Sequence, residues 1–341
     1  MIYICRDSEV VKRAGLKIPS LSECVGSNPT PCIMKVLVTG GAGFIASHVV
    51  DRYIELGHQV VVVDNLSAGK RENINKNAVF YEEDITNFEK LAEIFEKEKP
   101  DIVNHHAAQA LVSFSINNPQ LDAKTNIIGT INLLELSAKH KLKKFIYINS
   151  GGAGYGDPEY TPIKEEHPIK PLSNYGISKH TGEHYVVLYH SLYNLPYVCL
   201  RYANVYGPRQ DPLGEAGVIA IFTNKLIEKE QPTIFGDGSQ LRDYIYIKDV
   251  VDANVLALLN KDAENCSFNV GTGKTTSTQE IFDKLNKITN ANLSPIYGPE
   301  RQGDLKISSI DSSKLQKLGW KINYTIDKGL KETVSYYNKI R

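Results

Sequence analysis

VLVTGGAGFIASH, from Val36 to His48, is the stretch that decides the fold of this 341-residue chain. Its apolar, β-branched start predicts a buried strand, and the run after the glycines has apolar positions at helical spacing. Strand, glycine turn and helix in this order form a phosphate-binding unit, because N–H groups at the helix N-terminus face the anion. We expect Gly40 to allow the tight turn, Gly43 to leave room for a pyrophosphate, and the small Ala46 to let the helix lie close to the strand.

The next strand indicates which dinucleotide this turn binds, since a glycine turn alone is common between a strand and a helix. HQVVVVDNLSAG places an acid, Asp64, at the end of an apolar run, about 20 residues after the turn, where a ribose 2′-hydroxyl is held. A carboxylate there repels a 2′-phosphate, and the neighbouring Asn65 and Ser67 are polar but not basic. The pattern therefore predicts NAD as the cofactor.

Composition excludes several classes of partner. Lys and Arg together number 39, as do Asp and Glu, so the net charge is zero and no basic stripe indicates nucleic acid. No apolar run reaches the roughly 18 residues of a membrane span. Cys199 and Cys266 lie in apolar strands, which favours reduced thiols and a cytoplasmic location. His105 and His106 lack an accompanying carboxylate or third ligand, so we expect no metal site.

Residues 1–33 differ from the rest of the chain. They show no sustained periodicity and lack the apolar core and small-residue cleavage site of a signal peptide. Met34 begins the first strand directly. We expect this segment to be a non-native or disordered extension.

Strand and helix patterns then alternate up to about residue 200, which predicts a doubly wound parallel α/β sheet of the Rossmann type. Beyond that point the strands become shorter and the alternation loosens. We expect an NAD-binding domain at 34–200 and a smaller α/β substrate lobe at 201–341. Ligands of such sheets bind beyond the carboxyl ends of the strands, so the lobe is expected to close over that edge.

Tyr175 and Lys179 lie four residues apart in a helical pattern and share one helix face. A nearby ammonium lowers the pKa of a phenol, which is about 10 unperturbed, and brings a tyrosine closer to acting as a base. This spacing is common by chance. Here it follows about 25 residues after a strand that ends in Ser150, in a chain already predicted to bind a dinucleotide.

These residues together resemble a known family. TGGAGFIASH, DNLSAG, HHAAQ, SxxxxYG, YGISK, RYANVYGPRQ and RDYIYIKDVVDA, in this order, are similar to motifs of the extended short-chain dehydrogenase/reductase superfamily. More narrowly, they resemble its nucleotide-sugar branch, the NAD-dependent epimerase/dehydratase family, typified by UDP-glucose 4-epimerase. The resemblance extends from Met34 to about Trp320.

The resemblance implies a mechanism and a set of site residues. Tyr175 would take the proton of the sugar 4-hydroxyl while C4 gives hydride to tightly held NAD, and Lys179 would hold the nicotinamide ribose. The 4-keto sugar would then turn, and hydride would return to its other face. The matching cofactor residues are Gly40, Gly43, Phe44, Ile45, Asp64, Asn65, Ser67, Asp84, Ile85, Ala107, Ala108, Gln109, Asn126, Tyr175 and Lys179. The matching UDP-sugar residues are Ser150, Asn204, Arg209, Arg242, Arg301, Asp304 and Ser308, with Arg242 and Arg301 meeting the diphosphate.

One position departs from the family pattern. The third catalytic hydroxyl of the family usually lies four residues before the Tyr of the YG pair, which is Gly151 here. Either Ser150, one position earlier, takes this role through a shifted backbone, which we expect, or one hydroxyl hydrogen bond is missing. Sugar 4,6-dehydratases of this superfamily carry an Asp-Glu pair after that hydroxyl, whereas this chain has Gly151 and Gly152. Reversible oxidation at C4 without elimination is therefore the implied reaction.

The resemblance leaves the substrate open. UDP-glucose and UDP-galactose are the first expectation, and UDP-N-acetylglucosamine or another nucleotide sugar is the alternative. Ser308 replaces the Tyr that crowds the sugar C2 substituent in family members restricted to plain hexoses, which favours N-acetylated sugars as additional substrates. A non-catalytic NAD-binding regulator is a remote alternative, because Tyr175 and Lys179 are intact.

The resemblance also implies a homodimer formed by two helical stretches, 120–140 and 176–192. The apolar residues available in them for an interface are Ile127, Ile131, Leu134, Val186 and Leu188, although some must face the sheet.

Overall fold

The computed structural model describes residues 33–212, 217–300 and 305–340. Its centre is a parallel sheet with the strand order β11-β6-β5-β4-β1-β2-β3. The order reverses between β1 and β4, which is the arrangement of a doubly wound sheet, so the predicted fold class is confirmed. The strands are β1 Lys35–Thr39, β2 Gln59–Asp64, β3 Val79–Glu82, β4 Ile102–His105, β5 Lys144–Ser150, β6 Tyr197–Tyr202 and β11 Cys266–Val270.

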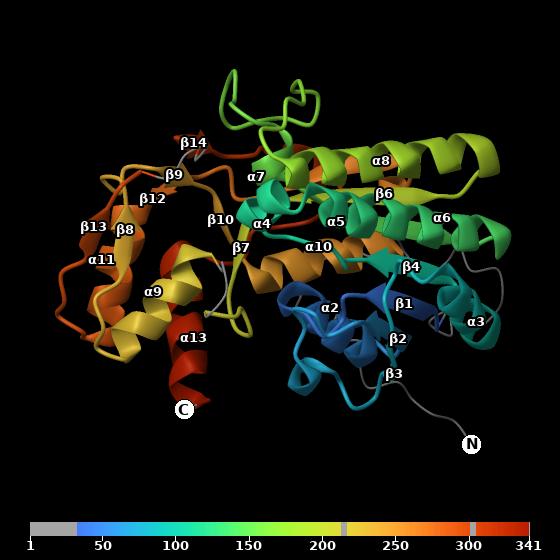
Figure 1. The fold of residues 1–341 in the computed structure, drawn as a ribbon, viewed down its shortest axis with the longest axis horizontal. Coiled ribbons are helices and arrows are strands. Elements are labelled where there is room, and N and C mark those ends of the chain that lie inside the picture. The colour runs from blue at the N-terminus through green and yellow to red at the C-terminus, as the bar shows by residue number, and fades with distance from the viewer. Residues whose placement is uncertain (1–32, 213–216, 301–304, 341) are drawn as a thin grey trace.

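Helices cover both faces of this sheet because its strands are apolar on both faces (Figure 1). In β1, Val36 and Val38 belong to the core cluster beneath α2 and α10, whereas Leu37 between them belongs to the cluster beneath α3, α6 and α8. This alternation follows from the period of two along a strand. The helices are α2 Phe44–Glu55, α3 Phe88–Glu98, α6 Gly129–Lys139, α8 Asn174–Tyr193 and α10 Ile247–Leu259.

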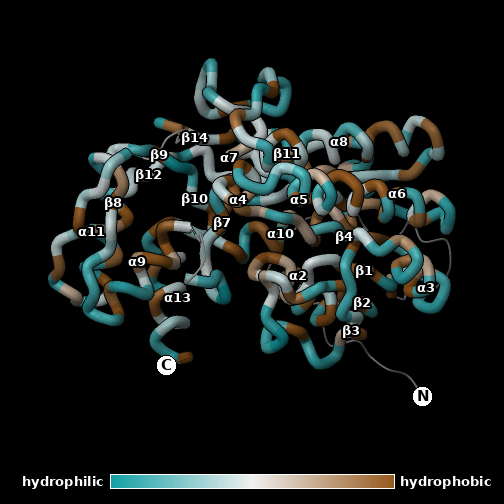
Figure 2. The backbone as a smooth tube through the Cα atoms, in the orientation of Figure 1, coloured by the Kyte–Doolittle hydropathy of each residue, from teal (hydrophilic) through white to brown (hydrophobic). Residues whose placement is uncertain are grey.

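The boundary predicted after residue 200 does not separate the two parts of the molecule. Strand β11 pairs in parallel with β6, and α10 packs on α2, although both elements come from the 201–341 segment. Figure 2 shows α10 largely in brown, and ten of its residues are buried. The chain therefore leaves the sheet after β6, returns for α10 and β11, and leaves it again.

The smaller lobe lies beside the sheet, at the left of Figure 1. Three helices, α9, α11 and α13, pack on one another there. Small sheets accompany them, with the pairings β10-β7, β12-β9-β14 and β13-β8. The bounds are β7 Asn204–Tyr206, α9 Val218–Ile227, β8 Thr233–Phe235, β9 Leu241–Arg242, β10 Tyr244–Tyr246, β12 Thr276–Ser277, α11 Thr278–Thr289, β13 Ile296–Gly298, β14 Ile307–Ser308, α12 Ser313–Gln316 and α13 Ile326–Lys339.

Short elements connect the main strands and helices: η2 Arg71–Asn73, α4 Val112–Asn117, α5 Pro119–Ala123, the π-helical η3 Lys124–Ile128, α7 Gly151–Gly154 and η4 Lys261–Ala263. No helix of the described residues is both long and apolar enough to cross a membrane. Two of the residues considered for a dimer interface, Leu134 and Val186, are buried in the core, because they face the sheet. Leu188 is 45% exposed.

Candidate active site

The glycine turn after β1 is forced into close contact with the end of β4. Gly40 has a φ of 72°, and a Cβ there would lie 2.8 Å from the backbone nitrogen of Ala107. Only glycine fits this close approach without strain. Gly43 is the N-cap of α2, and no side chain caps that helix N-terminus. The first N–H groups of α2, on Phe44 and Ile45, therefore face a site suited to an anion.

Asp64 lies at the end of β2 and is 6% exposed. Its carboxylate accepts the Ala42 N–H at 3.0 Å and the Leu66 N–H at 2.8 Å. Desolvation raises the pKa of this carboxyl, and the two backbone donors oppose that shift. A carboxylate accepts about four hydrogen bonds, so acceptor capacity is left for a ribose hydroxyl.

Polar side chains that follow β2 and β3 form hydrogen bonds with one another. Asn65 donates to Asp84 at 2.8 Å and accepts from the N–H and the hydroxyl of Ser67. Backbone and side-chain donors keep the pKa of Asp84 below its usual value, although desolvation opposes them. The Ile85 side chain is 4% exposed and packs in the core. The structure thus gathers these predicted cofactor residues on the same edge as Asp64.

Two hydrogen bonds to the Asn126 side-chain amide fix the loop after β4. The backbone N–H and C=O of Gln109 both bond to the Asn126 side chain, at 2.8 and 2.9 Å. Asn126 is 1% exposed, lies in the π-helical turn η3, and also donates to Ser178 of α8. It therefore holds the Ala107–Gln109 loop, including Ala108, against α8.

Tyr175 lies in the first turn of α8 and forms a hydrogen bond with the Ser150 side chain. Ser150 ends β5 and is the N-cap of α7, where its Oγ accepts the Ala153 N–H at 3.1 Å. Burial raises the pKa of Tyr175 to about 12, and the Ser150 hydrogen bond opposes that rise. The structure thus brings together the predicted hydroxyl and phenol groups, and Lys179 lies one helical turn further along α8.

Lys179 is 3% exposed, and burial lowers its pKa to about 7, with Asp122 of α5 acting in the opposite direction. The lowering of the Tyr175 pKa expected from Lys179 is wrong for the protein alone, because desolvation by burial dominates and raises the Tyr175 pKa. Within the described residues, the Lys179 ammonium contacts the face of the Tyr147 ring, 4.5 Å from its centroid, rather than a hydrogen-bond acceptor. A buried ammonium of this kind fits a cofactor hydroxyl.

The two glycines after Ser150 have different surroundings. A Cβ on Gly151 would lie 2.9 Å from Cδ1 of Ile310, so this position faces packed side chains. A Cβ on Gly152 would meet only Asn204 Oδ1 at 3.8 Å and Ser308 Oγ at 4.0 Å. Gly152 therefore opens toward predicted substrate residues, whereas Gly151 does not.

The remaining predicted substrate residues fall into three groups. Arg242 of β9 and Ser308 of β14 are paired in register, which places them near Asn204 and Gly152. Arg209 forms an ion pair of 2.7 Å with Asp51 of α2, so its guanidinium is engaged by the protein. Arg301 and Asp304 lie outside the described residues.

Sequence reasoning missed the buried carboxylates that support this site. Asp243 is 1% exposed and accepts the N–H groups of Thr272, Gly273 and Ile310, which ties the strand of Arg242 to the loops beside it. Glu183 on α8 is 4% exposed and pairs with Arg201 of β6 at 2.7 Å. The sequence carries one signal for Glu183, since an acid four residues after Lys179 shares its helix face.

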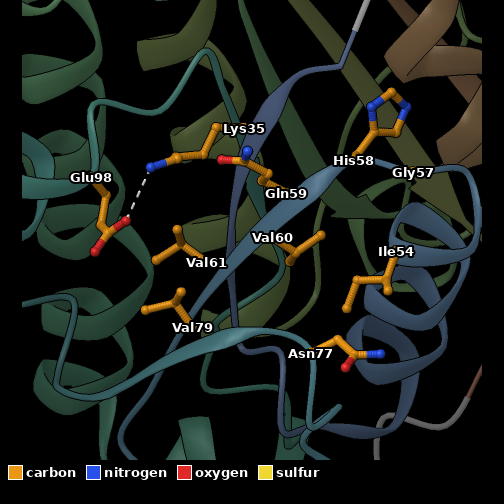
Figure 3. Close-up of a pocket in the computed structure, with 10 residues that line it drawn as sticks. All are labelled: Lys35, Ile54, Gly57, His58, Gln59, Val60, Val61, Asn77, Val79 and Glu98. Atoms are coloured by element: carbon orange, nitrogen blue, oxygen red, sulfur yellow. Dashed lines mark hydrogen bonds and ion pairs between the residues drawn. The ribbon is translucent and has the colours of Figure 1, made fainter. Parts of the chain in front are cut away.

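A cavity of about 400 Å³ lies at the other edge of the sheet (Figure 3). Its lining includes Lys35, Gln59 and Val79, the first residues of β1, β2 and β3. Ligand sites of doubly wound sheets lie at the carboxyl ends of the strands, so this cavity is not part of the site above.

The first histidine of the pair at the end of β4 is held by protein hydroxyls. His105 lies between the hydroxyls of Thr39 and Thr130, at 2.8 and 2.9 Å. Among the residues that the structure describes, no group of three or more His, Cys, Asp or Glu side chains is placed to hold a metal ion.

A model of the NAD dependent epimerase/dehydratase family matches residues 36–271, more than half of the chain. The chain belongs to this family. NAD is its cofactor, and the glycine turn, the uncapped α2 N-terminus, Asp64 and buried Lys179 fit that molecule.

Individual relatives resemble nearly the whole chain. A putative UDP-glucose 4-epimerase of Methanocaldococcus jannaschii is 45% identical over 301 residues, which cover 88% of this chain and 97% of the relative. The structure of a Thermotoga maritima UDP-glucose 4-epimerase with UDP-glucose is 50% identical, with a TM-score of 0.88, and covers 90% of this chain and 99% of its own. A UDP-N-acetylglucosamine 4-epimerase of Methanobrevibacter ruminantium, in complex with UDP-N-acetylmuramic acid, is 36% identical, with a TM-score of 0.86 and coverage of 91% and 99%.

Asp64 should set the choice between NAD and NADP. We expect NAD to bind more tightly by at least about tenfold, or about 1.4 kcal/mol, because the buried carboxylate would face a 2′-phosphate. Asp64→Ala and the shape-preserving Asp64→Asn should both narrow that gap, whereas Asp237→Ala on an exposed turn should not. Isothermal titration calorimetry with both cofactors checks this, and equal affinities for the wild type would contradict it.

Proposed function

We propose that this chain is a UDP-sugar 4-epimerase that interconverts UDP-glucose and UDP-galactose with tightly bound NAD. The observation that carries the proposal is the hydrogen bond between Ser150 and Tyr175, one helical turn before buried Lys179 on α8. Gly152, two residues after Ser150, faces Asn204 and Ser308. Family membership and relatives named UDP-glucose 4-epimerase support the same reaction.

The chain's own residues account for the proton chemistry. Tyr175 accepts the proton of the sugar 4-hydroxyl, and the Ser150 hydroxyl stabilises its phenolate by a hydrogen bond. The same phenol returns the proton to O4 after the 4-keto sugar has turned its opposite face toward the cofactor, so hydride returned to that face would invert C4. Bound NAD supplies the hydride acceptor and later the hydride donor at C4.

Other residues hold the two ligands. The α2 N-terminus and Gly43 would bind the pyrophosphate of NAD, Asp64 its adenine ribose, and Lys179 its nicotinamide ribose. On the substrate side, we assign Arg242 to the UDP diphosphate and Asn204 to the sugar. Arg301 and Asp304 are proposed to complete that half on the basis of the family motif.

The absence of side chains at 151 and 152 restricts the reaction. Loss of water from C5 and C6 of a sugar needs an acid and a base near the keto intermediate. Gly152 offers neither group on the side that faces Asn204 and Ser308. Epimerisation without elimination is therefore the reaction that these residues support.

Tyr175→Phe should lower kcat by about 10²–10⁴, the usual effect of removing a general base, and leave the fold intact. Ser150→Ala should lower it less, because the phenol remains. Conversion of UDP-galactose to UDP-glucose by purified protein measures both, with circular dichroism as the folding control. Near-normal turnover by Tyr175→Phe would contradict the mechanism. No conversion by the wild type would favour a non-catalytic NAD-binding protein.

The small side chain of Ser308 supports a wider substrate range. A Cβ on Gly152 would lie 4.0 Å from Ser308 Oγ, so two small residues are adjacent here, and a tyrosine ring at position 308 would fill volume that serine does not. Two tyrosines considered as occupants of this volume form hydrogen bonds elsewhere: Tyr206 is 2% exposed and donates to the Ile326 carbonyl, and Tyr297 donates to Gln279. We therefore propose that UDP-N-acetylglucosamine and its C4 epimer are also substrates.

Ser308→Tyr should reduce kcat/KM for the N-acetylated pair by about tenfold or more and change the plain hexose pair much less, because one aromatic ring exceeds the volume of an acetamido group. Ser308→Ala is the matched control and should keep both activities. Steady-state kinetics on both sugar pairs decides the point. Undetectable turnover of the N-acetylated pair by the wild type would contradict the proposed wider substrate range.

We also propose a homodimer formed through the outer faces of η3 and α8. Exposed apolar side chains lie on α5, η3 and α8, which contact one another: Leu121 48% on α5, Ile128 48% on η3, and Ile177 50%, Leu188 45% and Leu192 59% on α8. Large exposed apolar side chains on neighbouring helices are typical of an interface. The free thiols Cys199 and Cys266 fit the cytoplasmic location that we propose for the enzyme.

Leu188→Glu should convert the dimer to a monomer at micromolar concentration, because a charge would have to be desolvated in the interface. Leu259→Glu, at a residue of similar exposure on α10, is the control and should leave the dimer intact. Sedimentation velocity measures both. A monomeric wild type would contradict the proposal.

A further inference from the structure

The side chain of Asn149 connects the ion pair between α8 and β6 to Ser150, the residue that interacts with the Tyr175 phenol. Asn149 is 4% exposed on β5. Its Nδ2 donates to Oε2 of Glu183, and its Oδ1 accepts the Ser150 N–H at 2.7 Å. The same Glu183 carboxylate accepts from Nε and Nη2 of Arg201, at 3.1 and 2.7 Å.

Hydrogen-bond chemistry fixes the orientation of this amide. A carboxylate only accepts and a backbone N–H only donates, so the NH₂ group of Asn149 must face Glu183 and its oxygen must face Ser150. A flipped amide would oppose two acceptors on one side and two donors on the other. Asn149 therefore has one rotamer that satisfies both neighbours, and that rotamer fixes the Ser150 peptide.

Ser150 needs this support because of where the strand ends. The next residue, Gly151, faces Ile310 and cannot present a side chain to the site, so the hydroxyl beside Tyr175 has to come from Ser150. Ser150 is also the point at which β5 stops and α7 begins. A small rotation of its peptide would move Oγ away from the phenol.

We propose that Asn149 and Glu183 are positioning residues that hold Ser150 against Tyr175. This inference rests on the proposed epimerase function and adds to it residues that touch neither sugar nor cofactor. Tyr175, Lys179 and Glu183 lie at four-residue intervals on α8, so one helix carries the base, its ammonium neighbour and the anchor that sets the partner hydroxyl.

Several ionisable groups lie around Tyr175. The variants compared must all keep these groups, because a change of charge near the phenol would itself shift the Tyr175 pKa. Lys179 lies on its own helix, Asp122 on α5 and Tyr147 on β5. Asn149 and Ser267 are both uncharged, so replacing either one leaves this set of charges unchanged.

Ser267 provides a matched control. Its hydroxyl donates to Oε1 of Glu183 at 2.6 Å, so Ser267→Ala also removes one donor from the buried carboxylate. Ser267 lies on β11 and does not bond to Ser150. We expect Asn149→Ala to lower kcat by about 10–100-fold with KM changed less than about threefold, and Ser267→Ala to leave kcat within about threefold.

Two readouts separate positioning from general destabilisation. In a double-mutant cycle, Asn149→Ala should have little further effect on kcat once Ser150 is Ala, because both changes remove the same hydrogen bond to Tyr175. Losing that bond also raises the phenol pKa, so the rising limb of kcat should move to higher pH in Asn149→Ala and stay in place in Ser267→Ala. If Asn149→Ala does not fold, Asn149→Ser, which loses the carbonyl acceptor, takes its place.

A third readout does not depend on turnover. In protein labelled with [ζ-¹³C]tyrosine, the Tyr175 signal, assigned by its loss in Tyr175→Phe, should ionise less at a given alkaline pH in Asn149→Ala than in wild type or Ser267→Ala. Additive effects of Asn149 and Ser150, or the same phenol titration in all three proteins, would overturn the inference. An inactive wild type with the expected NMR shift would overturn only the proposed function.

Discussion

The buried ion pair between Glu183 and Arg201 is the interaction on which the active site depends. It joins helix α8 to β6 by two hydrogen bonds, and Asn149 of β5 and Ser267 of β11 donate two further hydrogen bonds to the Glu183 carboxylate. Arg201 also donates to the Tyr155 hydroxyl at 2.7 Å. Three adjacent strands are thus held to the helix that carries Tyr175 and Lys179.

The Glu183–Arg201 pair contributes more to fixing the position of α8 on the sheet than to the net free energy of unfolding. Taking both charges out of water costs about as much as their attraction returns, so apolar residues of similar volume would serve stability equally well. Removing one partner is different, because an uncompensated buried charge costs about 3–5 kcal/mol. Hydrogen bonding to Arg201 keeps the pKa of Glu183 below its ordinary value although burial acts against it, so the carboxylate stays ionised. Only one placement of α8 on the sheet satisfies these donors.

Close contacts at two glycines position the cofactor half of the site. Gly40 allows the turn after β1 to touch Ala107, and Gly129 lies against Ile85, where a Cβ would meet Cδ1 at 2.5 Å. The first contact joins the ends of β1 and β4, and the second joins α6 to the loop after β3. Burial raises the pKa of Tyr175 to about 12 and lowers that of Lys179 to about 7, so desolvation moves both groups toward their neutral forms.

The sequence by itself determined the doubly wound sheet, the phosphate-binding turn and the residues Asp64, Tyr175 and Lys179, because these depend on local periodicity and on spacings within one strand–helix unit. Only the tertiary structure decided that β11 and α10 return to the sheet from beyond residue 200, since strand pairing over such separations leaves no local pattern. It also decided that Ser150, not Gly151, faces the phenol. That choice depends on Ile310, which lies far along the chain and packs against Gly151, and on Asn149, whose amide is oriented by a carboxylate on another element.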